Sequence, residues 1–295
     1  MKKWIYFFSL IVGFASCEKD INFQPDSQAP KLVVDAQIET GQQPIVVLTN
    51  SLNYFSQINA SILANSFVHG AKIILTDGAT THQLKEYSYS ISGNNFYFYS
   101  NDIANPITAI TGKNGKQYNM TIEVNGATYT STTNIPLLTK KIDSIWWKKA
   151  PNNPDTTTAF VLVRVTDPPG LGNYIRYFTR NRNSNPFLPG ENSAYDDQVI
   201  DGKTYDVIVE QGIDRNMPRA SRDSAGFFYR GDTVTVKFCN TDKATFTFWN
   251  TWEFAYQSIG NPFSSPNKVL GNISNNALGA FCGYATQFKT IVIPK

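Results

Sequence analysis

The stretch Gln117–Thr132, QYNMTIEVNGATYTST, decides the fold of this chain. Asn125-Gly126 is the residue pair preferred in a two-residue type I′ turn, because both central positions of that turn need a positive φ. Before the turn, Met120, Ile122 and Val124 alternate with polar residues and therefore share one face of a strand. The stretch predicts an antiparallel hairpin with one buried and one solvated face.

The same alternation continues on both sides of this hairpin, and turn signals such as Asp77-Gly78 interrupt it. Pro136 cannot donate to a strand ladder, so we place a domain boundary at residues 137–140. Further strands are expected at residues 31–39, 44–50, 67–77, 80–87, 141–149, 157–166, 173–181, 205–210, 226–230, 233–238 and 290–293.

One long segment has a different period. Between Lys243 and Ile259 the apolar residues fall at helical spacing. Thr241 or Asp242 can cap the start of this helix, and Gly260 can end it. The stripe consists of Phe248, Trp249, Trp252, Ala255, Tyr256 and Ile259. We interpret its tryptophans as packing residues.

These patterns predict a mainly β fold with two tandem β-sandwich domains. The first domain, residues 30–138, is expected to be immunoglobulin- or transthyretin-like. The second domain, residues 139–295, is expected to be β-rich and to carry one amphipathic helix near residues 243–259.

Aromatic residues gather in another hairpin, where Phe-Tyr-Phe-Tyr at residues 96–99 follows a turn at 92–94. Alternation puts the phenylalanines on one face and Tyr97 and Tyr99 on the other. Either the phenylalanines pack in the core under an outer layer of tyrosines, or the hairpin presents an aromatic contact surface. Trp147, one of two adjacent tryptophans in a strand, is a candidate for the same surface.

Residues 1–16 have the pattern of a secretory signal peptide, with Lys2 and Lys3 before an apolar run and small residues at its end. The run is shorter than the about 20 residues that a membrane-spanning helix needs. Phe14-Ala15-Ser16-Cys17 resembles the lipobox of bacterial lipoproteins, which implies that Cys17 is acylated and becomes the mature N-terminus. The alternative is a plain cleaved signal peptide in which Cys17 is incidental.

Residues 17–29 are polar and lack periodicity, so we expect a flexible tether behind the lipidated cysteine. Glu18-Lys19-Asp20 resembles the surface-export signals of Bacteroidota-type lipoproteins, which implies exposure at the cell surface. Cys239 and Cys282 are the remaining cysteines. In an exported protein they form either a disulfide or two buried free thiols, and their distance decides between the two.

Motifs for catalysis are missing from the sequence. His69 and His82 are the only histidines, and no nucleophile elbow or phosphate-binding glycine loop is present. The densest acidic region lacks EF-hand spacing, and we interpret it as solvated loop carboxylates, with a calcium site as the alternative. It contains Asp196, Asp197, Asp201, Asp206 and Asp214. We therefore expect no enzyme activity, no cofactor and no metal. The formal net charge is +3, and the basic residues form no stripe along the sequence. Nucleic acid is therefore not an expected partner.

A series of short motifs runs in order along nearly the whole mature chain. It comprises Cys17-Glu18-Lys19-Asp20, 31–36 (KLVVDA), 70–78 (GAKIILTDG), 133–136 (TNIP), 142–145 (IDSI), 167–170 (DPPG) with Asn173-Tyr174, and 261–263 (NPF). This series resembles a domain-of-unknown-function family of Bacteroidota outer-membrane lipoproteins, often encoded beside TonB-dependent receptors. The resemblance implies a lipid-anchored partner of such a receptor and supplies no catalytic residues.

We therefore expect a non-enzymatic outer-membrane lipoprotein that assists a TonB-dependent receptor in ligand capture or uptake. A structural or adhesive cell-surface module is the first alternative. A hydrolase with an unrecognised site is the second, and a deep pocket with a histidine or a carboxylate pair would favour it.

Overall fold

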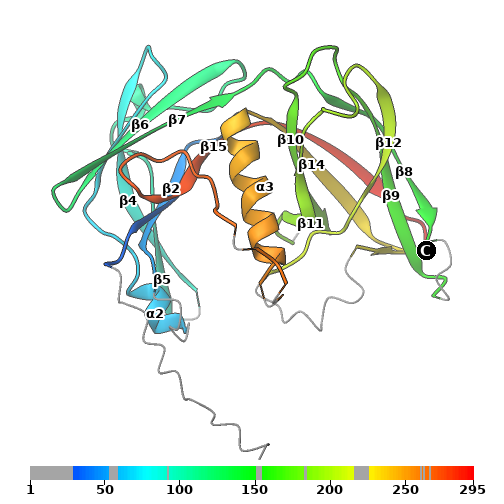
Figure 1. Cartoon of the computed structure of the whole chain (residues 1–295), viewed down its shortest axis with the longest axis horizontal. Coiled ribbons are helices and arrows are strands. Elements are labelled where there is room, and N and C mark those ends of the chain that lie inside the picture. The colour runs from blue at the N-terminus through cyan, green and yellow to red at the C-terminus, as the bar shows by residue number, and fades with distance from the viewer. Residues whose placement is uncertain are drawn as a thin grey trace, which may run out of the picture. The chain divides into compact units, whose positions relative to one another are not determined.

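The computed structural model describes residues 29–52, 59–91, 93–150, 155–182, 185–215, 226–259, 261, 263–265 and 267–295. The chain is mainly β, as predicted (Figure 1). The strands of the first half are β1 (Leu32–Glu39), β2 (Ile45–Asn50), β3 (Lys72–Thr76), β4 (Thr81–Ile91), β5 (Asn94–Asn101), β6 (Lys116–Val124) and β7 (Ala127–Ile135). Those of the second half are β8 (Lys141–Lys149), β9 (Thr158–Thr166), β10 (Tyr174–Asn181), β11 (Leu188–Tyr195), β12 (Thr204–Val209), β13 (Phe228–Tyr229), β14 (Thr233–Thr241) and β15 (Leu278–Val292). The described helices are α2 (Ala60–Ala64), α3 (Lys243–Gln257) and the 3-10 turn η1 (Pro106–Thr108).

The hairpin that decides the fold is confirmed as β6 and β7. Its turn residues Asn125 and Gly126 have φ angles of 51° and 75°, which is the positive region that the I′ turn requires. Met120 and Ile122 are 1% exposed, so the predicted apolar face is buried.

Eleven strands form one sheet in the order β11-β10-β14-β15-β1-β2-β5-β4-β3-β6-β7. A second sheet has the order β12-β9-β13, and β8 also pairs with β9. Two large apolar cores result. The first lies among β1 to β7, with Ile73, Ile122 and Phe281 fully buried. The second lies between β8, β9 and β12 on one side and β10 and β14 on the other, around Val163, Val236 and other aliphatic residues.

Strand β15 belongs to both halves of the chain. Its first part pairs in parallel with β1, and its second part pairs antiparallel with β14. Figure 1 shows β15 as the long red strand that runs from the blue strands to the green and yellow ones. Phe281 and Ala285 enter the first core, whereas Ile293, just beyond the strand, enters the second.

This sharing joins the two predicted β-rich halves through one strand. The chain does pass from the first core to the second between β7 and β8, at the predicted boundary. However, residues 31–295 form one compact unit, and the last strand completes the sheet of the first half. The sequence pattern does not predict this pairing, because the alternation within a strand does not specify which strand lies beside it.

Helix α3 is confirmed, and Asp242 caps it. One carboxylate oxygen of Asp242 accepts the N–H of Thr245 at 2.8 Å, and the other accepts the N–H of Asn134 on β7 at 2.8 Å. The cap therefore also ties the helix to the first half of the chain. Helix α3 ends at Gln257, and the expected terminator Gly260 lies outside the described residues.

The inner face of α3 packs on β10, β11 and β15 of the large sheet. The guanidinium of Arg176 lies 3.4 Å from the ring centre of Trp249, and its Nη1 donates to Tyr284 Oη at 3.2 Å. Glu253 is 3% exposed and accepts the backbone N–H of Ser193 at 2.8 Å. The tryptophans of the helix are thus packing residues that hold a buried polar layer.

Candidate functional site

A pocket of about 310 Å³ opens into the second core between β10 and β12. We call it the apolar pocket. It is lined by Val163, Ile175, Tyr177, Tyr195, Asp196, Val199, Ile200, Tyr205, Val207, Ile208, Val209 and Phe238. A predominantly apolar cavity with a few polar groups is the usual form of a small-molecule site, and this volume is at the small end of that class.

Aromatic and aliphatic side chains remain exposed at the mouth of the apolar pocket. Tyr177 and Tyr195 stack with ring centres 6.2 Å apart, and Tyr195 is 44% exposed. Val199 is 82% exposed and Val207 is 39% exposed. Burial, reinforced by Glu210 and Glu253, raises the pKa of Tyr195 to about 12. The tyrosine hydroxyls therefore stay protonated at physiological pH.

The rim of the apolar pocket is the loop between β11 and β12, and buried Asp197 holds this loop in place. The N–H groups of Gly172 and Asn173 each donate to Asp197 Oδ2 at 2.9 Å. Burial raises the pKa of Asp197, but these hydrogen bonds outweigh burial and lower the pKa below its usual value. The carboxylate is therefore ionised at neutral pH.

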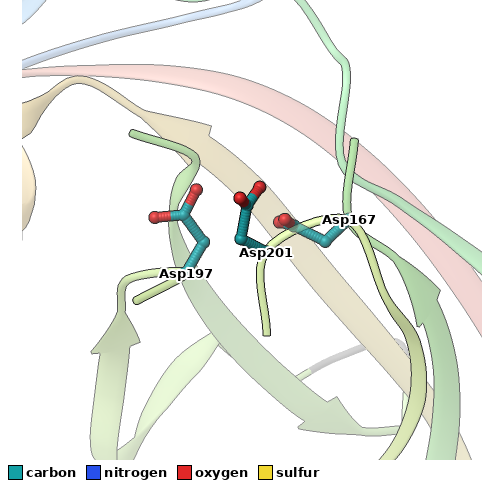
Figure 2. Close-up of side chains that lie close together, drawn as sticks. All are labelled: Asp167, Asp197 and Asp201. Atoms are coloured by element: carbon teal, nitrogen blue, oxygen red, sulfur yellow. The ribbon is translucent and has the colours of Figure 1, made fainter. Parts of the chain in front are cut away.

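Two further aspartates converge beside Asp197, as Figure 2 shows. Asp167, directly after β9, accepts the N–H of Gly202 at 3.1 Å, while Asp201 accepts the N–H of Gly170 at 2.7 Å. The two turns therefore hold each other through reciprocal hydrogen bonds. This pairing gives the Asp-Pro-Pro-Gly motif a structural role, because its turn braces the rim of the pocket.

Lys140 closes this group of carboxylates. Its Nζ lies 2.8 Å from Asp167 Oδ1, and both side chains are completely buried. The angles at this contact are not those of a hydrogen bond, so the two groups meet as an ion pair. We call Asp167, Asp197, Asp201 and Lys140 the acidic joint.

Carboxylate oxygens of the three aspartates lie within 4.8 Å of one another, which is close enough to hold a metal ion. Each aspartate, however, already accepts a backbone N–H or faces the Lys140 ammonium. These contacts give the acidic joint a role in holding the fold together. Of the other acidic residues singled out from the sequence, Asp206 forms a two-contact pair with Arg164, Asp196 lines the apolar pocket, and Asp214 is exposed.

A wider polar pocket of about 620 Å³ lies beside β3 and β4 and includes His82, Glu86 and Asp102 among its lining residues. This is the kind of site that would favour a hydrolase. His82 is nevertheless engaged at both ring nitrogens. Its Nδ1 lies 2.7 Å from Thr108 Oγ1, and its Nε2 accepts the N–H of Asp102 at 2.8 Å. Burial lowers the pKa of His82, so the ring is neutral and its basic nitrogen is already occupied.

Glu86 is the other titratable group in the polar pocket. Its Oε1 lies 2.5 Å from Nδ1 of His69, and its Oε2 accepts the N–H of Gly70 and the hydroxyl of Tyr99, each at 2.9 Å. Burial opposes ionisation, but these hydrogen bonds lower the pKa of Glu86 overall. The arrangement holds an ionised, fully engaged carboxylate, which is poorly suited to accept a proton from a substrate.

The aromatic hairpin alternates as expected, but its faces are reversed. Tyr99 is 2% exposed and belongs to the first core, whereas Phe96 and Phe98 lie on the opposite, partly exposed face. The tyrosine can enter the core because its hydroxyl finds partners there: it donates to Glu86 Oε2 and accepts the N–H of Ala71 at 3.1 Å, and the carbonyl oxygen of Val68 lies 3.0 Å away.

The other residues of the expected aromatic contact surface are half-buried. Tyr97 packs edge-on against the rings of Phe67 and His69, with centres 5.6 and 4.4 Å apart. Trp147 packs against the second core, with the Arg230 guanidinium 5.3 Å from its ring centre. The three residues Tyr97, Tyr99 and Trp147 are therefore not brought together into one surface.

The two cysteines of the body are free, buried thiols. Cys239 on β14 lies opposite Thr286, four positions along β15 from Cys282. At about 3.3 Å per residue the two cysteines are separated by about 13 Å, which exceeds the reach of a disulfide. Of the two alternatives that the sequence leaves open, the structure has the buried free thiols. Cys17 lies outside the described residues.

Sequence reasoning missed the apolar pocket and the lysine of the acidic joint. Tyr177, Tyr195 and Val207 look like ordinary alternating strand residues, and nothing local marks an unfilled core. Lys140 lies in the predicted boundary segment and resembles a linker residue. The one available signal was the Asp-Pro-Pro-Gly turn beside a cluster of aspartates, and it does not specify a partner.

The fold and these sites define a mainly β protein with two cores, a shared last strand and an apolar pocket. The chain belongs to the family of the domain of unknown function DUF4249, whose model matches residues 18–290. The match confirms the predicted kind of family. No curated protein matches the chain. In the part of the chain that the structure describes, neither α2 nor α3 has the length and hydrophobicity of a membrane-spanning helix.

Proposed function

We propose that this chain is a non-enzymatic lipoprotein of the bacterial outer membrane, anchored through acylated Cys17 and exposed at the cell surface. It assists a TonB-dependent receptor by holding an apolar ligand in the pocket between β10 and β12. The apolar pocket carries the proposal, because it is a pre-formed site with a braced rim and an aromatic mouth.

Two observations support the anchor. The small residues before Cys17 fit a lipobox, and the family model begins at Glu18, the residue directly after the proposed acylation site. A cysteine in this position carries three acyl chains in bacterial lipoproteins. Because each buried CH₂ contributes about 0.8 kcal/mol, such an anchor is effectively permanent.

The lining of the apolar pocket supports binding over catalysis. Its walls are aliphatic and aromatic, and its tyrosines hold their protons at neutral pH. Asp196 is the one carboxylate among the described lining residues. General acid–base chemistry needs a group whose protonation state changes near the working pH, and a single carboxylate at an open rim does not supply a pair.

A fluorescent apolar probe, N-phenyl-1-naphthylamine, tests the pocket. Val207→Trp fills the mouth and is expected to lower probe affinity at least tenfold. Val292→Trp, an equal change at an exposed position of β15 outside the pocket, is expected to leave affinity unchanged. Equal affinity in the two variants would remove the pocket from the proposal.

The anchor and the receptor are tested in cells. Labelled palmitate should enter the wild-type protein and not Cys17→Ser, and the tagged lipoprotein should co-purify with a TonB-dependent receptor from solubilised outer membrane. A labelled protein that brings down no receptor would instead favour the adhesive module. In that case, cells without the gene would lose attachment and grow normally on every nutrient.

A further inference from the structure

An exposed apolar patch lies at the end of the sheet where the chain enters the body. Lys31 and Ser51 meet there, with the N–H of Ser51 donating to the Lys31 carbonyl at 2.8 Å. Thr49 bridges to Phe67, and the ring of Phe67 lies 6.1 Å from that of Phe96. The tip of the β4–β5 hairpin therefore stands beside the point of entry, near α2 (Figure 1).

The patch is built from large apolar side chains. Ile91 is 54% exposed, Tyr89 is 50% exposed, and Tyr89 stacks on Phe96 with ring centres 5.5 Å apart. Leu63 on α2 and Leu52 after β2 add further exposed apolar surface. We define the entry patch as Leu52, Leu63, Phe67, Tyr89, Ile91 and Phe96.

The segments that carry the entry patch contain no charged residue, and Lys31, at the point of entry, lies beside them. No Asp, Glu, Lys or Arg occurs from Gly41 to Ala71 or from Tyr87 to Asn101, although 17% of the whole chain is charged. A charged group is costly to bring into hydrocarbon, whereas Tyr is favoured at the level of the lipid headgroups and aliphatic side chains enter hydrocarbon favourably. Segments without charged side chains can therefore contact a lipid surface without burying a charge.

The length of the tether between Cys17 and the first strand also indicates a lipid surface as the partner of the entry patch. Cys17 and Lys31 are fourteen residues apart, so the tether spans at most about 50 Å even when fully extended. An acyl anchor at Cys17 therefore keeps the entry end of the body near the bilayer. Tethering raises the local concentration of the patch at the membrane, so even weak contact is maintained.

We propose that the entry patch seats the body directly on the lipid surface into which Cys17 is anchored. This inference rests on the lipid anchor of the proposed function. The patch adds a second, reversible contact that orients the body and leaves the apolar pocket, in the other half of the chain, away from the point of entry. Because the patch lacks charge, its binding is apolar and insensitive to salt.

Vesicle co-sedimentation of the mature Cys17→Ser chain tests the patch without any acyl group. The chain should sediment with phosphatidylcholine vesicles to the same extent at 50 mM and 500 mM salt, within about twofold. Tyr89→Ser/Ile91→Ser should lose at least tenfold in binding. The matched control is Ile103→Ser/Ile107→Ser, which removes two exposed isoleucines beyond the other end of β5 and should bind like its parent.

A second variant reports contact independently of any loss of binding. Ile91→Trp should shift its fluorescence to the blue with vesicles, whereas Ile107→Trp should not. Absence of binding, loss of binding at high salt, or equal binding by the two double variants would overturn the inference. So would a dimer that Tyr89→Ser/Ile91→Ser makes monomeric without any vesicle binding. Because the protein is unacylated and no receptor is present, a missing anchor or receptor in cells leaves this result unaffected.

Discussion

Lys140 Nζ and Asp167 Oδ1 lie 2.8 Å apart, with both side chains completely buried. The backbone around Lys140 is held as firmly, because its N–H donates to Asn240 Oδ1 at 3.0 Å and its carbonyl accepts from Asn240 Nδ2 at 2.8 Å. The link between the two cores is therefore pinned to the turn that braces the apolar pocket.

Lys140→Met should destabilise the protein strongly. Removing one partner of a buried ion pair leaves the other charge uncompensated and costs about 3–5 kcal/mol. For a body of this size that corresponds to a fall in melting temperature of about 10 °C. Lys140→Met/Asp167→Asn removes both charges but keeps an oxygen that can accept the Gly202 N–H, and it should recover most of the loss in thermal denaturation. A Lys140→Met protein that melts like the wild type would contradict the ion pair.

The ionised carboxylate of Asp197 makes the stability of the protein depend on pH. Its pKa is lowered in the folded state, so its contribution is fully present above the unfolded pKa of about 3.9 and is lost as the pH falls through the folded value. Asp197→Asn should cost about 1–3 kcal/mol at pH 7. In urea titrations the gap between wild type and variant should shrink as the pH drops below about 4. A gap of constant size down to pH 2.5 would show that the carboxylate charge is not what these N–H donors stabilise.

The acidic joint also shows how far the sequence leads. Alternation along β6 and β7 and the stripe of α3 are local patterns, and both predict their elements correctly. The pairing of Lys140 with Asp167, and of Phe281 with the first core, depends on which segments meet, and no local pattern carries that information. The aromatic hairpin combines both situations. Its alternation can be predicted from the sequence, but which of its two faces is buried depends on residues elsewhere in the chain that form hydrogen bonds with the Tyr99 hydroxyl.

Cys239 and Cys282 should be unreactive in the native protein. Burial raises the pKa of each thiol to about 12, and only the thiolate is nucleophilic. Native Cys17→Ser protein should therefore give no colour with a disulfide reagent at pH 8, and the same protein in guanidinium should release two equivalents without prior reduction. Colour only after reduction would mean that the cysteines are bonded.

The shared strand β15 should make the two cores unfold together. All tryptophans beyond the predicted signal peptide lie in the second half of the chain, so their fluorescence reports on that half alone. Ile122 is buried in the first core at 1% exposure, and Ile122→Ala should cost about 2–5 kcal/mol by leaving a cavity. Because Phe281 and Ala285 join that core to β15, the tryptophan-detected melting temperature should fall with it, by about 10 °C. Val236→Ala, in the second core, is the matched reference and should shift the same signal. If Ile122→Ala lowers the circular-dichroism transition while the tryptophan transition stays in place, the halves unfold separately and β15 does not couple them.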